Sequence, residues 1–160
     1  AAKQLDFYGI GPSNLVAADA ALKCMRLGMR ATAYNNHLEM LMNAKISRSD
    51  HLALLISYTG ETEQILDVAS ELVVRSVPMV SLTSMSDNSL KRICPTNLFV
   101  EASESWDRLG GMSSRISTLS VIDILFTALI NRDYERYTRI ANSVYVGKRL
   151  EDGGPINRIR

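Results

Sequence analysis

An apolar run that ends in hydroxyl groups and a glycine constrains the fold of this chain most. Residues 51–56 (HLALLI) are typical of a buried strand, and residues 57–62 (SYTGET) follow at once. Residues 63–74 then carry apolar side chains at helical spacing. The chain therefore turns from a buried strand directly into a helix, as the strand–helix units of parallel sheets do.

The chemistry of residues 57–62 suits a phosphate group. Gly60 permits a tight turn with the backbone close to a ligand, and Ser57, Thr59 and Thr62 offer hydroxyl donors. The first turn of the following helix adds unpaired N–H groups and a partial positive charge. The loop has no lysine, which excludes the P-loop pattern of nucleotide-binding proteins. A simple turn with one N-cap hydroxyl is the alternative interpretation.

The same alternation of strands and helices runs through the first hundred residues. It predicts an α/β fold: a doubly wound, five-stranded parallel sheet of the flavodoxin-like order 2-1-3-4-5, with helices on both faces. The strands are expected at 5–10, 30–34, 51–56, 79–83 and 97–100, and the helices at 13–27, 38–46, 63–74 and 89–93.

The last third of the chain changes character. Residues 113–131 form one long helical pattern that is apolar around more than one stripe. Such a helix is buried on two sides, either against the sheet and a second copy of the chain or within one domain. Asp133 is expected to cap a further helix that ends near residue 146. We therefore expect one domain over 1–146 and a mobile tail over 147–160.

Composition limits the cellular compartment and the partners that we expect for this chain. The 160 residues carry a net charge of only +1, which gives no nucleic-acid footprint in this segment. Cys24 and Cys94 are too few for a disulfide or metal framework, so we expect a reducing cytoplasm, no metal and no cofactor. We find no signal peptide and no apolar run of membrane length, and so expect no membrane partner.

The first strand ends in a second candidate loop, Gly9-Ile10-Gly11-Pro12-Ser13-Asn14. It only partly matches a dinucleotide fingerprint, because Asn14 replaces the third glycine and no acidic residue ends the second strand; NAD is not expected. In a doubly wound sheet the loops after the first and third strands lie side by side at the carboxyl edge. Ser13 and residues 57–62 are therefore predicted to meet one ligand.

These loops resemble those of the SIS (sugar isomerase) domain, over about Leu5 to Asn131. Within that family, the later segments look most like the C-terminal effector domain of RpiR-type bacterial transcriptional regulators. The resemblance implies a domain that follows an N-terminal helix-turn-helix, senses a phosphosugar and forms a homodimer or a higher homo-oligomer. DNA would then be bound only through a domain absent from this chain, which is either a truncated or a stand-alone domain. The segments that carry the resemblance are 9–13, 57–62, 82–84, 110–116 and 121–126.

The resemblance also implies which residues contact the phosphosugar. Ser57, Thr59, Gly60 and Thr62 match the phosphate loop, and Ser13 matches the serine of the first loop.

Four further candidates depend on their place in the chain. His37 follows the second strand, where such regulators place a sugar-contacting side chain; it equally suits a helix start. Glu101 and Glu104 follow the fifth strand and could contact sugar hydroxyls or simply be solvated. Arg115 could reach a phosphate or a neighbouring subunit, or only cap the packing of the long helix. His51, beside Asp50, is expected at the surface.

Two function classes follow. The first is a phosphosugar-binding effector domain of a sugar-responsive regulator, for which an N-acetylated hexose 6-phosphate is one candidate ligand. The second is a phosphosugar isomerase or related lyase, in which Glu101 or Glu104 with His37 would supply the acid and base. We favour the binding module and assign no catalytic residue. A purely structural dimerisation domain is a third interpretation.

Overall fold

The fold is one parallel five-stranded sheet. A computed structural model of the protein describes residues 2–101 and 112–144. The sheet has the order β2-β1-β3-β4-β5, and every neighbouring pair is parallel. This confirms the predicted fold class. The strands are β1 (Gln4–Gly9), β2 (Ala31–Ala33), β3 (His51–Ile56), β4 (Met79–Ser84) and β5 (Thr96–Val100).

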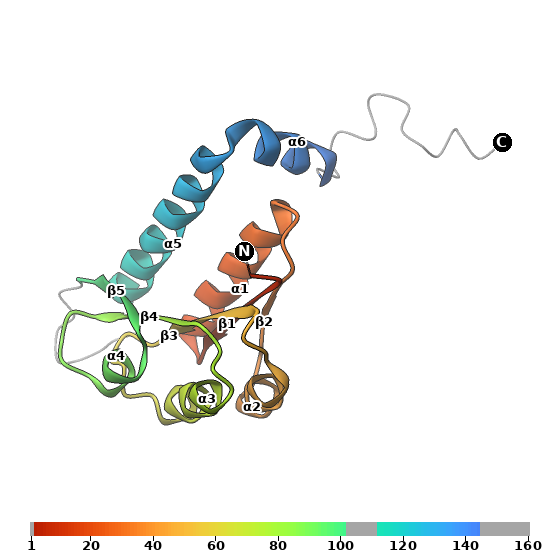
Figure 1. Ribbon diagram of the computed structural model, residues 1–160. Helices are drawn as coiled ribbons and strands as arrows, with labels where there is room; N and C mark the ends of the chain where they lie inside the picture. The colour runs from red at the N-terminus through yellow and green to blue at the C-terminus, as the bar shows by residue number, and fades with distance from the viewer. Residues whose placement is uncertain (1, 102–111, 145–160) are drawn as a thin grey trace.

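Helices cover both faces of the sheet, as Figure 1 shows. Helices α1 and α5 lie on one face, and α2, α3 and α4 lie on the other. Helix α6 follows α5 and packs over the end of α1, where a Cβ on Gly28 would lie only 3.1 Å from Ile140. The helices are α1 (Pro12–Arg26), α2 (His37–Ile46), α3 (Glu63–Val74), α4 (Ser89–Ile93), α5 (Met112–Arg132) and α6 (Tyr134–Val144).

The face under α2, α3 and α4 is closely packed. Leu55 of β3 and Ile65 and Leu72 of α3 are fully buried in one cluster, together with Met40 of α2 and Leu90 of α4. These side chains recur at the spacing that the sequence pattern predicted for a helix against a sheet. The cluster fixes α3 and α4, which hold the loop that follows β3.

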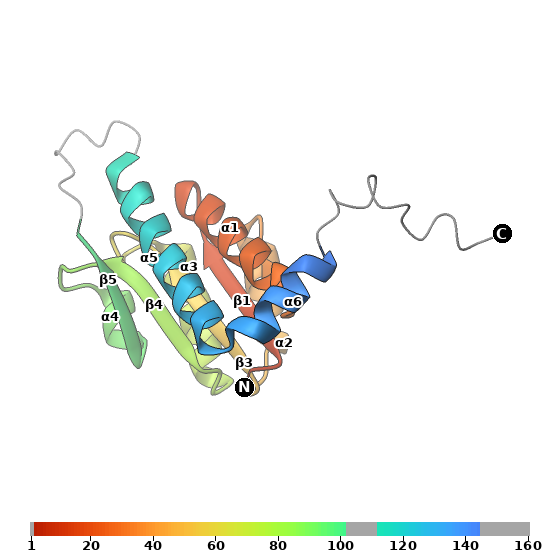
Figure 2. The same ribbon diagram turned by 90° about the horizontal axis from the view of Figure 1, so that it is seen from above.

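The sheet face under α1 and α5 is less completely packed. Val16 and Ala20 of α1 and Ile122 of α5 are buried against it. Between α1, α5 and the strands, a groove of about 320 Å³ remains, with Leu54 and Leu98 on its floor. Figure 2 shows α5 running beside α1 across this face.

Helix α5 is more exposed than a helix buried on two sides. Ile122 is buried, but Ile116 and Ile124 are 63% and 66% exposed, and Leu125 is 41% exposed. Our expectation that no segment has membrane length was wrong: residues Ser113–Arg132 are long and apolar enough to cross a bilayer by length and composition alone. The helix nevertheless packs on α1 and β5, and its Asp123 forms an ion pair with Lys23 of α1 at 2.5 Å.

The end of the described chain agrees in part with the sequence pattern. Asp133 accepts a hydrogen bond from the backbone N–H of Arg136 at 3.3 Å and so caps α6, as predicted. Helix α6 is described to Val144. The predicted domain boundary near residue 146 and the tail 147–160 lie outside the described residues.

A buried polar network lies at the amino end of β1. Asp6 is 1% exposed and accepts hydrogen bonds from Tyr34 at 2.8 Å and from Gln4 at 3.1 Å. His51 Nδ1 lies 3.3 Å from the Asp6 carboxylate, and its side chain is only 19% exposed. The expectation that His51 is a surface residue was therefore wrong, because a buried carboxylate on the adjacent strand draws the ring inward.

Candidate functional site

Strand register brings the two predicted loops to one place. Gly9 at the end of β1 pairs with Ile56 at the end of β3. The next residues along each strand therefore begin the loops that contain Ser13 and Ser57, side by side at the carboxyl edge of the sheet. The order 2-1-3-4-5 makes this the point where the chain reverses direction across the sheet, and ligands of such folds bind there.

The hydroxyl groups of the 57–62 loop bond to one another and to their own backbone. Ser57 Oγ and Thr62 Oγ1 lie 2.8 Å apart. Ser57 Oγ also accepts the N–H of Gly60, and Thr59 Oγ1 accepts the N–H of Glu61, both at 3.2 Å. The loop is thus preformed, with its hydroxyl oxygens held in fixed positions.

Most of the donor capacity of these hydroxyls stays free for a ligand. Thr59 only accepts in these contacts, so its O–H can still donate. One hydrogen serves the Ser57–Thr62 contact, and the other hydroxyl of that pair keeps its own. Two O–H donors therefore remain at the loop.

The structure disfavours the interpretation of this loop as a simple helix cap. Thr62 occupies the N-cap position of α3, but its side chain makes no cap hydrogen bond. The first-turn N–H groups of α3 therefore stay without a side-chain cap, and they carry the partial positive charge of the helix terminus. Both features are those of an anion site at a helix N-terminus.

Gly60 shapes the loop by its small size. It has φ 67°, and a Cβ at this position would lie 2.1 Å from Oδ1 of Asn88. Its N–H is bonded to Ser57, and its carbonyl accepts the N–H of Leu90 at 3.0 Å. Gly60 therefore lets the loop pack directly against α4, and its polar backbone groups are already used.

Asn88 and Glu61 fix the loop from the α4 side, and the sequence analysis assigned neither of them. Asn88 is fully buried; it caps α4 through Lys91 N–H at 2.8 Å and donates to Thr83 Oγ1 at 3.2 Å. Glu61 accepts the N–H of Ser89 at 2.8 Å. An asparagine directly before a helix was the available signal for Asn88, because it is a preferred N-cap residue.

The first loop is held equally closely. A Cβ on Gly9 would lie 2.6 Å from the carbonyl oxygen of Ser13, so only glycine lets α1 begin this near the strand. Gly11 precedes the helix with φ 57°, in open space. Ser13 lies half-buried in the first turn of α1, as predicted, and no side chain caps that turn.

His37 begins α2 and faces α3. Its Nε2 lies 3.4 Å from the carboxylate of Asp67, and its side chain is 35% exposed. Asn36, not His37, caps α2, by accepting the N–H of Glu39 at 3.0 Å. His37 is thus the first residue of α2, as its helix-start interpretation predicted, although Asn36 supplies the cap. The contact with Asp67 joins α2 to α3.

The remaining candidates lie at the rim or beyond the described residues. Glu101 follows β5 directly and is exposed, and Arg115 is exposed in the first turn of α5. Glu104 lies outside the described residues. No interaction within the described chain brings Glu101 or Arg115 to the 57–62 loop.

Within residues 2–101 and 112–144, no group of three or more metal-ligating side chains occurs. Burial raises the pKa of both thiols, Cys24 and Cys94, to about 11, so neither is an activated nucleophile at neutral pH. The two carboxyl-edge loops offer neutral hydroxyl and N–H donors at helix termini. These groups can bind an anion by hydrogen bonds.

The chain matches one known family over most of its length. The SIS domain family matches residues 1–128. The chain belongs to the SIS domain family. This confirms the predicted resemblance.

A curated relative of this SIS domain is a regulator. An uncharacterised HTH-type transcriptional regulator of Caldanaerobacter subterraneus is 36% identical over 139 residues, which are 86% of this chain and 49% of that protein. The chain thus spans about half the length of this curated relative.

Solved structures share the fold. The NanR protein of Vibrio vulnificus, complexed with ManNAc-6P, superposes with a TM-score of 0.82 at 24% identity, over 89% of this chain and 54% of that one. The sugar isomerase domain of an RpiR transcription factor from Sphaerobacter thermophilus gives 0.77 at 20% identity, over 89% and 76%. A putative sugar-phosphate isomerase from Listeria monocytogenes gives 0.76 at 14%, over 86% and 74%.

Proposed function

We propose that this SIS domain is the phosphosugar-binding effector domain of a sugar-responsive transcriptional regulator. The observation that carries the proposal is the preformed 57–62 loop, which presents free hydroxyl donors beside the uncapped N-terminus of α3. The regulator relative supports the second half of the proposal. DNA binding would belong to a separate helix-turn-helix domain, and such a protein works in the cytoplasm.

The phosphate of the ligand would lie on the 57–62 loop. Thr59 and whichever of Ser57 and Thr62 keeps its free O–H would donate to its oxygens together with the first-turn N–H groups of α3, and Ser13 would approach from the adjacent loop. The sugar would extend toward the rim, where His37, Glu101, Glu104 and Arg115 are the candidate contacts. A hexose 6-phosphate with an N-acetyl group is the first ligand to test, because NanR of Vibrio vulnificus is complexed with ManNAc-6P.

We propose further that α5 mediates association with a second copy. Ile116 and Ile124 are exposed eight residues apart on α5, whereas Leu125 lines the groove beside α1, and exposed apolar side chains that gather on one face mark interaction surfaces. A two-fold symmetric contact would cover the same face on both copies.

A thermal-shift screen against hexose 6-phosphates, their N-acetylated analogues and the corresponding free sugars tests this function. A ligand at 100 times its dissociation constant adds about 2.7 kcal/mol to the free energy of unfolding. We expect stabilisation by a phosphosugar and none by its free sugar at equal concentration. Stabilisation by both alike, or by none of the panel, would refute the phosphosugar proposal.

The isomerase alternative has its own test. An aldose–ketose isomerase needs a positioned acid and base. Among the described candidates, His37 Nε2 lies 3.4 Å from the Asp67 carboxylate but makes no hydrogen bond within the described residues, and Glu101 is exposed at the rim. Incubating the domain with the stabilising phosphosugar and following the sugar by NMR separates the two functions: an unchanged substrate supports the binding module, and conversion supports the enzyme.

A further inference from the structure

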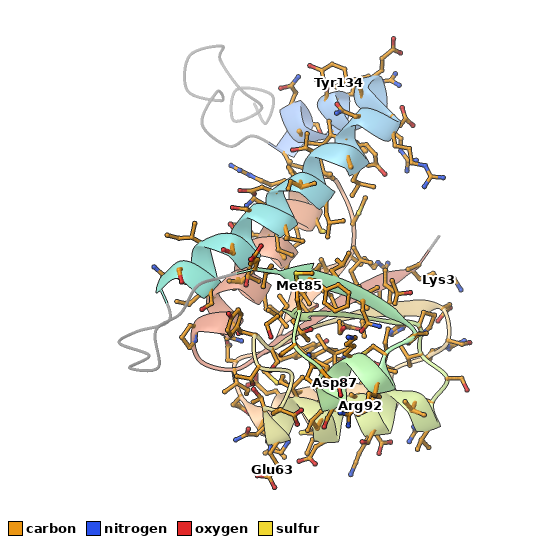
Figure 3. All side chains as sticks on the ribbon, turned by 90° about the vertical axis from the view of Figure 1, so that its left-hand side faces the viewer. Lys3, Glu63, Met85, Asp87, Arg92 and Tyr134 are labelled. Atoms are coloured by element: carbon orange, nitrogen blue, oxygen red, sulfur yellow. The ribbon has the colours of Figure 1, made fainter. Side chains whose placement is uncertain are left out.

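A second cleft lies at the opposite edge of the sheet from the 57–62 loop. It measures about 1120 Å³ and is bordered by Lys3 before β1, Arg30 before β2, and Arg132 and Arg136 at the α5–α6 corner. Figure 2 shows the N-terminus of the chain and the α5–α6 corner on the same side of the sheet. Figure 3 labels Lys3 at this end of the molecule, away from Glu63 of α3 and Arg92 of α4.

The charge of this cleft is unbalanced. Its lining includes four basic residues and one carboxylate, that of Asp133, whereas the whole chain has 18 basic and 17 acidic residues. The Asp133 carboxylate already caps α6. The cleft therefore concentrates positive charge, although the chain as a whole is nearly neutral, with a net charge of +1.

The arginines of the cleft have no carboxylate partner among the described residues, a feature that they share with Arg26, Lys45 and Arg115. Lys23, Arg48, Arg75 and Arg92 each form an ion pair with a carboxylate. Within the described residues, the side chains of Arg30, Arg132 and Arg136 form none, and Lys3 shares Asp50 with Arg48. Three guanidinium groups, one before β2 and two at the α5–α6 corner, are thus available to a bidentate acceptor such as phosphate.

The floor of the cleft is apolar and carries an aromatic ring. Leu5, Leu52 and Leu129 line it, and the Arg136 guanidinium lies 5.6 Å from the centroid of the Tyr137 ring. Sites for organic ligands combine an apolar wall with a few convergent polar groups in this way. An aromatic ring stacked beside an arginine suits a flat heterocycle.

We propose that this cleft is a second ligand site, which binds an organic polyphosphate with a flat apolar group, of the nucleotide type. Arg30, Arg132 and Arg136 hold the phosphates, and Tyr137 with the leucine floor contacts the heterocycle. The volume of the cleft accommodates a ligand of that size. The site is separate from the carboxyl-edge loops, and so does not depend on the proposed phosphosugar function.

Calorimetry with ATP, inorganic pyrophosphate and adenosine as probes tests the proposal. We expect the wild-type domain to bind ATP most tightly, pyrophosphate more weakly and adenosine weakest. Arg30→Gln and Arg132→Gln should each weaken ATP binding about tenfold, because each removes a charge-assisted contact. Tyr137→Ala should weaken the binding of ATP but not of pyrophosphate.

Two matched controls make the result specific. Arg75→Gln removes the same charge from an arginine that pairs with Glu71 on α3, and should leave ATP binding unchanged. Thr59→Ala should also leave it unchanged, which separates this site from the phosphosugar loop. Because Arg30 and Arg132 are exposed, thermal melts of both variants should match the wild type.

Three outcomes would overturn the proposal. They are no binding of ATP to the wild-type domain, an equal loss in Arg75→Gln, and binding of a duplex oligonucleotide that outcompetes ATP and is lost in the same variants. The last outcome would assign the cleft to a nucleic acid instead.

Discussion

The two faces of the sheet differ in how completely they are packed. Under α2, α3 and α4 the core is closed, and Leu55, Ile65 and Leu90 have no exposed surface. Under α1 and α5 a groove of about 320 Å³ remains, and apolar side chains of α5 face outward. The closed face supports the α3–α4 side of the binding loop, so it supplies rigidity. The open face leaves α5 available for association.

Removal of a core side chain should show the largest contrast between the faces. Leu55→Ala opens a cavity in the closed face and should cost about 3–5 kcal/mol of unfolding free energy. Leu98→Ala on the other face should cost about 1–2 kcal/mol, because Leu98 is half-buried and already borders a groove. Chemical denaturation of both variants measures the difference. Equal losses would mean that the groove is filled by a rearrangement of α5.

A comparison of two glycines tests how rigidly the closed face holds the loop. Gly60→Ala introduces a Cβ against buried Asn88 and strains a positive φ, which should cost about 3 kcal/mol. Gly11→Ala strains a similar φ in open space and should cost about 1 kcal/mol. Thermal melting separates the two, and an equal shift would show that Asn88 moves aside easily.

Charge on α5 tests the open face. Ile124→Asp should convert an associated form to a monomer in sedimentation, because it places a carboxylate in an apolar contact. Leu38→Asp on α2 is the matched control, since Leu38 is equally exposed, at 68%, on the other face. Loss of association in the control, and not in the α5 variant, would move the interface to α2.

High pH should weaken the fold modestly through the ionisation of Tyr34, which follows β2. Burial, and then the hydrogen bond to Asp6, raise the pKa of Tyr34 above its ordinary value of 10.0. The folded state therefore favours the neutral phenol. This stability is fully present below pH 10 and decreases as the pH rises above it, by up to about 1.4 kcal/mol per unit. Tyr34→Phe should make the decrease above pH 10 shallower in denaturation curves, and an unchanged slope would contradict this cause.

The sequence predicted the fold well, because strands and helices alternate with clear periodicity and glycines mark the turns. The assignment of Ser57, Thr59 and Thr62 to a phosphate loop came from the hydroxyl groups of the loop and from the family resemblance, and it stays a prediction. The sequence could not reveal that Asn88 packs against Gly60, or that Asp67 pairs with His37, because these contacts join segments far apart in the chain.

Two other expectations, on His51 and on α5, differ from the structure for a different physical reason. His51 looked like a surface residue because its neighbour Asp50 is charged, whereas the adjacent strand supplies Asp6 as a buried partner. The apolar pattern of α5 predicted burial on two sides, but several of its apolar side chains are exposed. An apolar pattern does not identify the element, or the second copy of the chain, that would cover them.

The central claim is that the 57–62 loop binds the phosphate of a phosphosugar, and calorimetry on one hydroxyl tests it most directly. The phosphosugar that stabilises the wild type in the thermal-shift screen is titrated into the wild type, Thr59→Ala and the control Thr96→Ala, at the opposite edge of the sheet. We predict that Thr59→Ala weakens binding about tenfold, since one charge-assisted hydrogen bond is lost, whereas Thr96→Ala does not. Equal affinity in all three proteins would contradict the account.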